Sequence, residues 1–296
     1  MQSVLTLPSF AKINWTLRVL GRRDDGFHEL CTVFQTVSLH DTLSFADSDA
    51  LGLTCDDPTV PTDERNLIIK AATVLSDFGR VDRGAAIHLK KRIPSPGGLG
   101  GGSSNAAVAL IGLKRLWSIE ISEAELHSIS ASLGSDVPFF LRGGTALGTG
   151  RGEVIEPIHY GHEEWVLIVT PDVHVTTRDA FERINAETLT NADVDRILRV
   201  CRLEAEARDF GRSVLINDFE ASVFSAFPEI RRVKETLIDL GAINAAMSGS
   251  GASVFAIFDK EETRQAAIKA LDHESTWRKF AVATISRDQY REALGI

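Results

Sequence analysis

The sequence has few cysteines, no long apolar run and no excess of positive charge. Its three cysteines are odd in number and far apart, so they predict neither a disulfide framework nor a metal site, as expected for a cytoplasmic protein. No run of about 18 apolar residues occurs, and no basic and apolar leader opens the chain, which argues against a membrane span and a secretory signal. A net charge of −9 argues against nucleic acid as a partner.

Glycine, by contrast, is concentrated in residues 93–105, which read IPSPGGLGGGSSN. Alternating apolar residues at 87–93 predict a strand before this stretch, and helical spacing at 106–117 predicts a helix after it. Glycines ahead of a helix start allow positive φ and close approach to an anion, so the stretch predicts a phosphate-binding loop rather than a flexible surface loop. It is not a P-loop, which needs lysine where Ser103 stands, and it does not fit the dinucleotide-binding pattern.

Three other places supply candidate functional groups. Lys12 and Asn14 lie two residues apart in a predicted strand and therefore share a face, which either lines a cleft or forms the polar outer side of a sheet. Asp136 follows the predicted helix stop at Gly134, where a role in the turn competes with a catalytic role. A second loop of small residues is either a plain hairpin turn or a surface that a ligand approaches closely; it comprises Ser248, Gly249, Ser250 and Gly251.

A chain of 296 residues suits one large or two medium-sized domains. A polar segment at 159–164 precedes a predicted strand, so we place the boundary there and predict domains at 1–158 and 159–296. The first domain contains the Gly-rich loop. The second alternates strands and helices around an antiparallel sheet, which is an α+β pattern.

In order and spacing, segments 8–14, 94–105 and 247–253 resemble the three motifs of the GHMP small-molecule kinases. Further matches at 26–28, 134–138 and 217–220 resemble the branch of that family that acts on a cytidine diphosphate derivative of methylerythritol, in non-mevalonate isoprenoid synthesis. The resemblance covers nearly the whole chain. It implies a two-domain α+β fold, with an N-terminal domain like domain 2 of ribosomal protein S5 and a ferredoxin-like C-terminal domain.

The resemblance also implies transfer of the γ-phosphoryl group of ATP to the 2-hydroxyl of the methylerythritol unit. Asp136 is then the base that takes the hydroxyl proton, and Lys12 keeps it ionised and oriented. Mg²⁺ is expected to bridge the phosphates. Its ligand from the protein is left open between the hydroxyl of Ser103, the hydroxyl of Ser104 and none, with water alone. The residues expected to hold ATP are Pro94, Ser95, Pro96, Gly97, Gly98, Leu99, Gly100, Gly101, Gly102, Ser103 and Ser104.

For the second substrate, the resemblance implies contacts from Asn14 and His28, and rings of Phe27 and Phe181 on the two faces of the cytosine. Phe27 stands where the family commonly has tyrosine, and Pro96 where it prefers a small residue. Three alternatives remain open at this stage: another GHMP kinase acting on homoserine, mevalonate or a sugar, a non-catalytic ligand sensor, and a dinucleotide-dependent oxidoreductase. The oligomeric state is left open.

Overall fold

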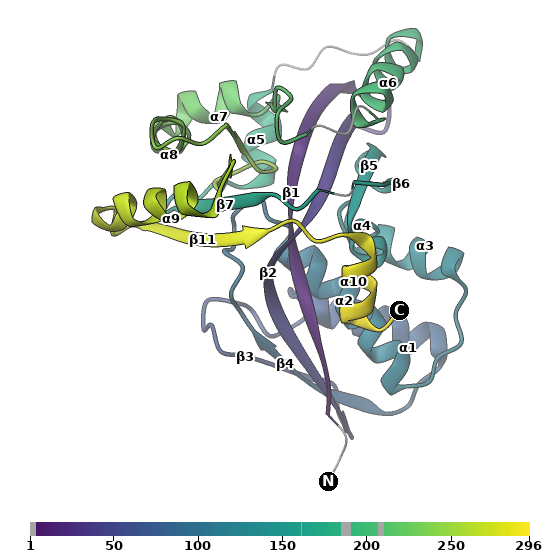
Figure 1. Cartoon of the computed structure of the whole chain (residues 1–296). Coiled ribbons are helices and arrows are strands. Elements are labelled where there is room, and N and C mark those ends of the chain that lie inside the picture. Colours follow the sequence, from purple (N-terminus) through teal and green to yellow (C-terminus); the bar gives the residue numbers. More distant parts are fainter. Residues whose placement is uncertain (1–3, 161, 185–190, 207–209) are drawn as a thin grey trace.

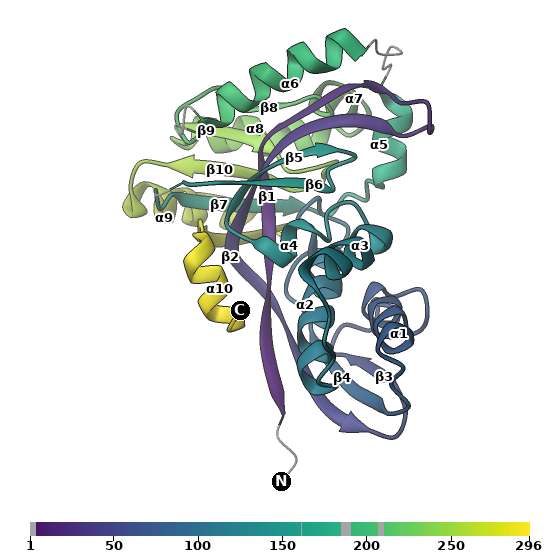
Figure 2. The same ribbon diagram turned by 90° about the vertical axis from the view of Figure 1, so that its right-hand side faces the viewer.

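A long antiparallel hairpin forms the spine of the molecule. The computed structural model describes residues 4–160, 162–184, 191–206 and 210–296. Strands β1 (Leu5–Arg22) and β2 (His28–Ser48) pair along almost their whole length and run between the two ends of the molecule (Figures 1 and 2). The sequence predicts shorter strands here. Register shifts, at Phe10/Ala11 among others, let each strand continue as one element.

The first sheet is built around this hairpin. Its order is β3 (Gly52–Cys55), β4 (Gly84–Lys90), β2, β1 and β8 (Ile216–Asn217), while β5 (Thr145–Gly150) pairs with β2 and with β6 (Val154–Ile158). Helices α1 (Leu67–Gly79) and α2 (Gly101–Leu116) pack together against it, near α3 (Glu123–Leu133) and α4 (Phe139–Arg142) (Figure 1). The core of this end is the apolar run of α2, which is buried from Ser104 to Leu113.

The second sheet has four antiparallel strands in the order β11 (Trp277–Ala283), β7 (Trp165–Pro171), β10 (Val254–Phe258) and β9 (Asn244–Met247). Helix α8 (Pro228–Asp239) buries Ile230, Val233 and Leu237 in the core formed with β9 and β10. Figure 2 shows the other helices of this end around the sheet; they are α5 (Thr177–Arg183), α6 (Asn191–Glu206), α7 (Glu220–Ala226) and α9 (Glu261–Ala270). The chain is therefore a mixed α+β protein. No helix in the described ranges is long and apolar enough to cross a membrane.

Two segments from the second half of the chain join the first sheet and its core. Strand β8 pairs in parallel with β1 at Thr16 and Leu17. A final helix that the sequence did not predict, α10 (Arg287–Leu294), buries Tyr290 and Leu294 in the core of the first sheet. The proposed boundary between residues 158 and 159 stays a prediction.

The prediction that the cysteines form no disulfide is wrong. Cys31 on β2 and Cys201 on α6 are joined by a disulfide, with their Cα atoms 6.5 Å apart. Both side chains are buried, whereas Cys55 is a free thiol. The two partners are separated by 170 residues, so only the packing of α6 beside β2 brings them together.

Candidate functional site

The Gly-rich segment lies where β4 gives way to α2. Gly98 and Gly100 both have a φ of +70°, which residues with a side chain rarely adopt. A Cβ atom on Gly98 would lie 1.9 Å from the carbonyl oxygen of Ser248, so only glycine allows this close approach. Helix α2 begins at Gly101, five residues before its predicted start, and its N-cap Gly100 supplies no capping side chain. The N-terminal end of α2, where the amides and the positive dipole are unpaired, lies at the pocket described below, which Gly102 and Ser103 line.

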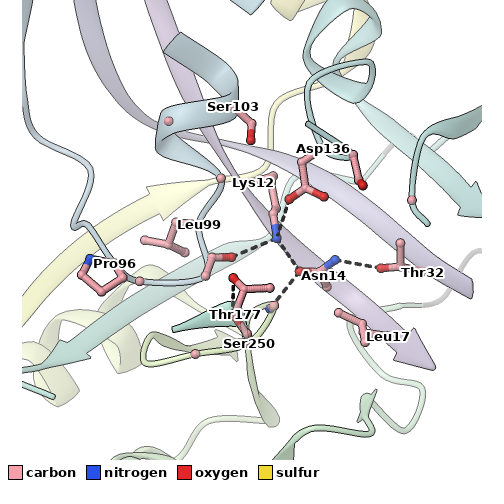
Figure 3. Close-up of a pocket in the computed structure, with 18 of the residues that line it drawn as sticks. Lys12, Asn14, Leu17, Thr32, Pro96, Leu99, Ser103, Asp136, Thr177 and Ser250 are labelled. Carbon is pink, nitrogen blue, oxygen red and sulfur yellow. Dashed lines mark hydrogen bonds and ion pairs between the residues drawn. The ribbon is translucent and has the colours of Figure 1, made fainter. Parts of the chain in front are cut away.

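Lys12 is the centre of a hydrogen-bond network on β1 (Figure 3). Its Nζ donates to Asn14 Oδ1 at 2.8 Å and to the carbonyl of Gly98 at 2.9 Å, and it lies 3.6 Å from Asp136 Oδ2. The side chain is buried, and this desolvation lowers the pKa of Lys12, an effect that the charge of Asp136 opposes. An ammonium group with three donors is thus held by three oxygen-bearing partners.

Asn14 connects β1 to two other segments. Its Nδ2 donates to Thr32 Oγ1 on β2 at 2.7 Å, and its Oδ1 accepts from the amide of Gly249 at 2.9 Å as well as from Lys12. The side chain is buried and both of its polar ends have partners. Lys12 and Asn14 therefore share the face that lines a cleft, and the alternative of a polar outer face is wrong.

The second small-residue loop supports the first. Ser248 Oγ donates to the carbonyl of Gly98 at 2.9 Å. Asn217 Nδ2 donates to the carbonyls of Met247 and Gly249, at 2.7 and 2.8 Å, which fixes the loop from the other side. The loop is thus more than a hairpin turn, because it makes direct contact with the Gly-rich segment and with Asn14.

Asp136 lies in the turn between α3 and α4. The residues that follow it, Val137, Phe139 and Phe140, are buried and anchor the turn in the first core. The Asp136 side chain remains 33% exposed, which leaves its carboxylate accessible from the pocket beside Lys12 (Figure 3). A fixed carboxylate beside a buried ammonium group, facing a helix N-terminus, suits proton transfer next to a bound anion.

Lys12, Asn14 and Asp136 line one pocket of about 360 Å³, which adjoins a second of about 630 Å³. The second is lined by Phe27 and His28 at the tip of the hairpin, and Phe181, Arg151 and Thr177 line both. His28 and Phe181 stack with ring centroids 4.9 Å apart, while the Arg151 guanidinium lies 4.8 Å from the centroid of the half-exposed Phe27 ring. Burial, and then Arg22, lower the pKa of His28.

Known proteins are similar in sequence to most of this chain. Residues 66–144 match the GHMP kinases N terminal domain, and residues 198–275 match the GHMP kinases C terminal domain. A protein of Pelodictyon phaeoclathratiforme, named 4-diphosphocytidyl-2-C-methyl-D-erythritol kinase, is 38% identical over 90% of this chain and 93% of its own. The chain belongs to the GHMP kinase family. A Thermodesulfovibrio yellowstonii protein of the same name is 37% identical to this kinase, over 90% of the chain and 94% of its own.

Solved structures agree with the fold. A crystal structure of 4-(cytidine 5'-diphospho)-2C-methyl-D-erythritol kinase superposes on this kinase with a TM-score of 0.77 and 31% identity, covering 95% of this chain and 99% of its own. A homoserine kinase from Cytophaga hutchinsonii gives a TM-score of 0.73 at 20% identity, covering 98% and 97% of the two chains. The latter likeness concerns the fold alone.

Most of the residues predicted for the phosphate loop line the first pocket of the kinase. Two do not. Ser104 is buried and accepts a hydrogen bond from Ser9 Oγ at 2.8 Å, and Gly101 is buried against Ile93. Ser103 does line the pocket, so its hydroxyl is the better placed of the two serines (Figure 3). The structure brings Lys12, Asn14, Asp136 and Phe181 to this pocket, and Phe27 and His28 to the adjoining one.

Arg151, Thr32 and Thr177 are among the pocket residues that were not predicted from the sequence. Arg151 lies in the Gly150–Gly152 turn after β5, which the sequence showed only as strand punctuation. Thr32 holds Asn14, and Thr177 Oγ1 is hydrogen bonded to Ser250 Oγ at 3.2 Å. An arginine between two glycines is a signal that could have revealed Arg151, whereas the two threonines gave no local signal.

Proposed function

We propose that this kinase transfers the γ-phosphoryl group of ATP to the 2-hydroxyl of 4-diphosphocytidyl-2-C-methyl-D-erythritol. The observation that carries the proposal is the Lys12–Asp136 ion pair in a pocket that opens into a second, aromatic one. Relatives named for this activity match the chain along nine-tenths of its length. We place the reaction in the cytoplasm, where ATP is available.

The first pocket is the ATP half of the proposed site. The uncapped N-terminus of α2 and the positive-φ glycines Gly98 and Gly100 present backbone amides and a positive dipole to the phosphates. Oxygen ligands suit Mg²⁺, and the Ser103 hydroxyl and the Asp136 carboxylate both face this pocket. Mg²⁺ would neutralise charge on the phosphates when bound. Within the described ranges, no cluster of three or more His, Cys, Asp or Glu competes for a metal.

The second pocket is the cytidine half. Its stacked His28 and Phe181 rings provide a flat surface for the base, and Phe27 lies at its rim. His28 is neutral at neutral pH because burial and Arg22 lower its pKa, so its imidazole can both donate and accept a hydrogen bond. Arg151 lines both pockets, and its guanidinium suits the diphosphate that joins cytidine and polyol.

Asp136 then takes the proton of the attacking hydroxyl at its accessible carboxylate. Lys12 has its donors committed to Asn14, Gly98 and Asp136, so it positions the carboxylate and supplies positive charge where charge develops. Phosphoryl transfer needs little covalent chemistry beyond this positioning and neutralisation.

Asp136→Asn tests the proposal. We expect kcat with ATP and the cytidyl substrate to fall by about 10²–10⁴-fold, as is typical of losing a general base, while ATP binding measured by calorimetry stays close to wild type. Asp47→Asn, which removes an exposed carboxylate paired with Arg83, is the matched control and should leave kcat unchanged. Near-normal turnover by the Asp136 variant would remove this residue from the role. Turnover of homoserine or mevalonate, with none of the cytidyl compound, would overturn the substrate assignment.

A further inference from the structure

A third cavity, of about 360 Å³, lies apart from the two pockets of the proposed active site. It is lined by residues of α2, α3, α4 and α10 and by Gly295 and Ile296 after α10, and none of its lining residues lines either of the other two. Hydrogen bonds join α10 to Arg115 of α2 and to Phe140 of α4, and Figure 1 shows α10 at the end of the molecule that carries the first core. Its lining combines the apolar side chains of Ile111, Leu126 and Leu141 with the cationic side chains of Lys114, Arg142 and Arg291.

The cations of this cavity are poorly balanced by anions. The side chains of Lys114 and Arg291 have no hydrogen-bond or ion-pair partner among the described residues. Arg142 Nη2 lies 3.4 Å from Glu123 Oε2, but that carboxylate is 86% exposed, so the pair contributes little. Arg115 is already engaged, because it donates to the carbonyl of Gly295 at the end of α10.

A neighbouring arginine shows the same imbalance. Nε and Nη2 of Arg287 are buried and have no acceptor in the described part of the chain. Burial, and then Arg142 and Arg291, lower the pKa of Arg287, while the nearby Asp288 opposes this. The chain as a whole carries a net charge of −9, so a cluster of mutually repelling cations differs from the average charge of the protein. Such a cluster is stabilised by a bound anion.

We propose that this cavity binds a small organic anion that consists of a phosphate or carboxylate head and a short apolar chain. The head lies between Arg142 and Arg291, where charge-assisted hydrogen bonds from guanidinium groups are available. The apolar chain lies against Ile111, Leu126 and Leu141. This binding site shares no lining residue with the proposed active site, so the two proposals are tested separately.

Titration calorimetry with n-hexyl phosphate tests this site. A non-hydrolysable ATP analogue and cytidine diphosphate are present at saturation, so that the two pockets of the proposed active site are occupied. We expect one molecule of n-hexyl phosphate to bind, more tightly than inorganic phosphate does. The double variant Arg142→Gln/Arg291→Gln should bind it at least about tenfold more weakly, because each lost charge-assisted bond is worth roughly that factor.

The matched control is Arg65→Gln/Arg83→Gln, which removes the same charge from two exposed arginines paired with Asp63 and Asp47. It should bind n-hexyl phosphate as the wild type does. Thermal unfolding followed by circular dichroism shows whether each variant is folded before it is titrated. Absence of binding to the wild type, equal affinity of the two double variants, or equal affinity for n-hexyl phosphate and inorganic phosphate would each overturn the proposal.

Discussion

Asp41 on β2 is a buried carboxylate that ties the Gly-rich segment to the sheet. Its Oδ1 accepts from the amides of Arg92 and Ile93, at 2.6 and 2.8 Å, and its Oδ2 accepts from Lys91 Nζ at 2.8 Å and Asn105 Nδ2 at 3.1 Å. The side chain has no solvent exposure and that of Lys91 has 6%. One residue therefore fixes both the entrance to the loop and the second turn of α2, which makes Asp41→Asn an informative substitution.

The size of the effect follows from burial. Asparagine keeps one oxygen as an acceptor but replaces the other with an amide NH2 group, which is a donor and would face partners that are themselves donors. It also leaves the Lys91 ammonium group without its counter-charge. Breaking a buried pair in this way costs about 3–5 kcal/mol of the free energy of unfolding, against a typical total of about 5–15 kcal/mol. Lys91→Met should also destabilise, because it leaves the Asp41 carboxylate unpaired. The double variant removes both charges, so its loss should be smaller than the sum by roughly 0.5–3 kcal/mol.

Urea denaturation of the four proteins measures these free energies, and steady-state kinetics measures their functional consequence. Asp41 lines neither pocket of the proposed active site, but it anchors only the loop assigned to ATP. We therefore expect the KM for ATP to rise in Asp41→Asn while the KM for the cytidyl substrate stays near wild type. A loss below about 1 kcal/mol, as for an exposed pair, or an additive cycle would refute the energetic reasoning. Equal changes in the two KM values would refute the positioning role.

Two further predictions concern the loop and the cytidine half. Gly98→Ala should lower the midpoint of urea denaturation markedly, because its Cβ would meet the Ser248 carbonyl. The control Gly102→Ala, whose Cβ would have its nearest contact at 3.8 Å, should leave the midpoint at or above the wild-type value. Similar losses in the two variants would contradict this prediction. The pKa of His28 is lowered from 6.5, chiefly by burial and then by Arg22, so the neutral ring persists to lower pH in the folded protein than in the unfolded chain. Folding and base binding that depend on the neutral ring are fully supported above pH 6.5 and weaken as the pH falls through the lowered pKa. The KM for the cytidyl substrate should therefore rise on the acid side in the wild type and not in His28→Gln, and parallel profiles would argue against His28.

The groups at the reactive end of the candidate site could be located from local patterns, whereas the roles expected of Lys12 and Asp136 came from the family resemblance. Strand alternation puts Lys12 and Asn14 on one face, and a run of glycines between a strand and a helix is visible without a fold. The start of α2 was predicted too late because glycine and serine are poor helix formers. In the structure, buried hydrogen bonds from Ser9 to Ser104 and from Asn105 to Asp41 hold that first part of the helix, and they override the intrinsic preference.

The remainder depends on contacts between segments that are far apart in the chain. Ser248 reaches the Gly98 carbonyl across 150 residues, and Asn217 holds the loop that Ser248 begins. The sequence around Gly98 contains no signal for Ser248 or Asn217, so no local pattern could have shown that the second small-residue loop supports the Gly-rich segment. The same holds for the Cys31–Cys201 disulfide and for the cations around α10. Local sequence thus supplies the groups that carry the chemistry, while the groups that hold them in place become visible only when the fold brings distant segments together.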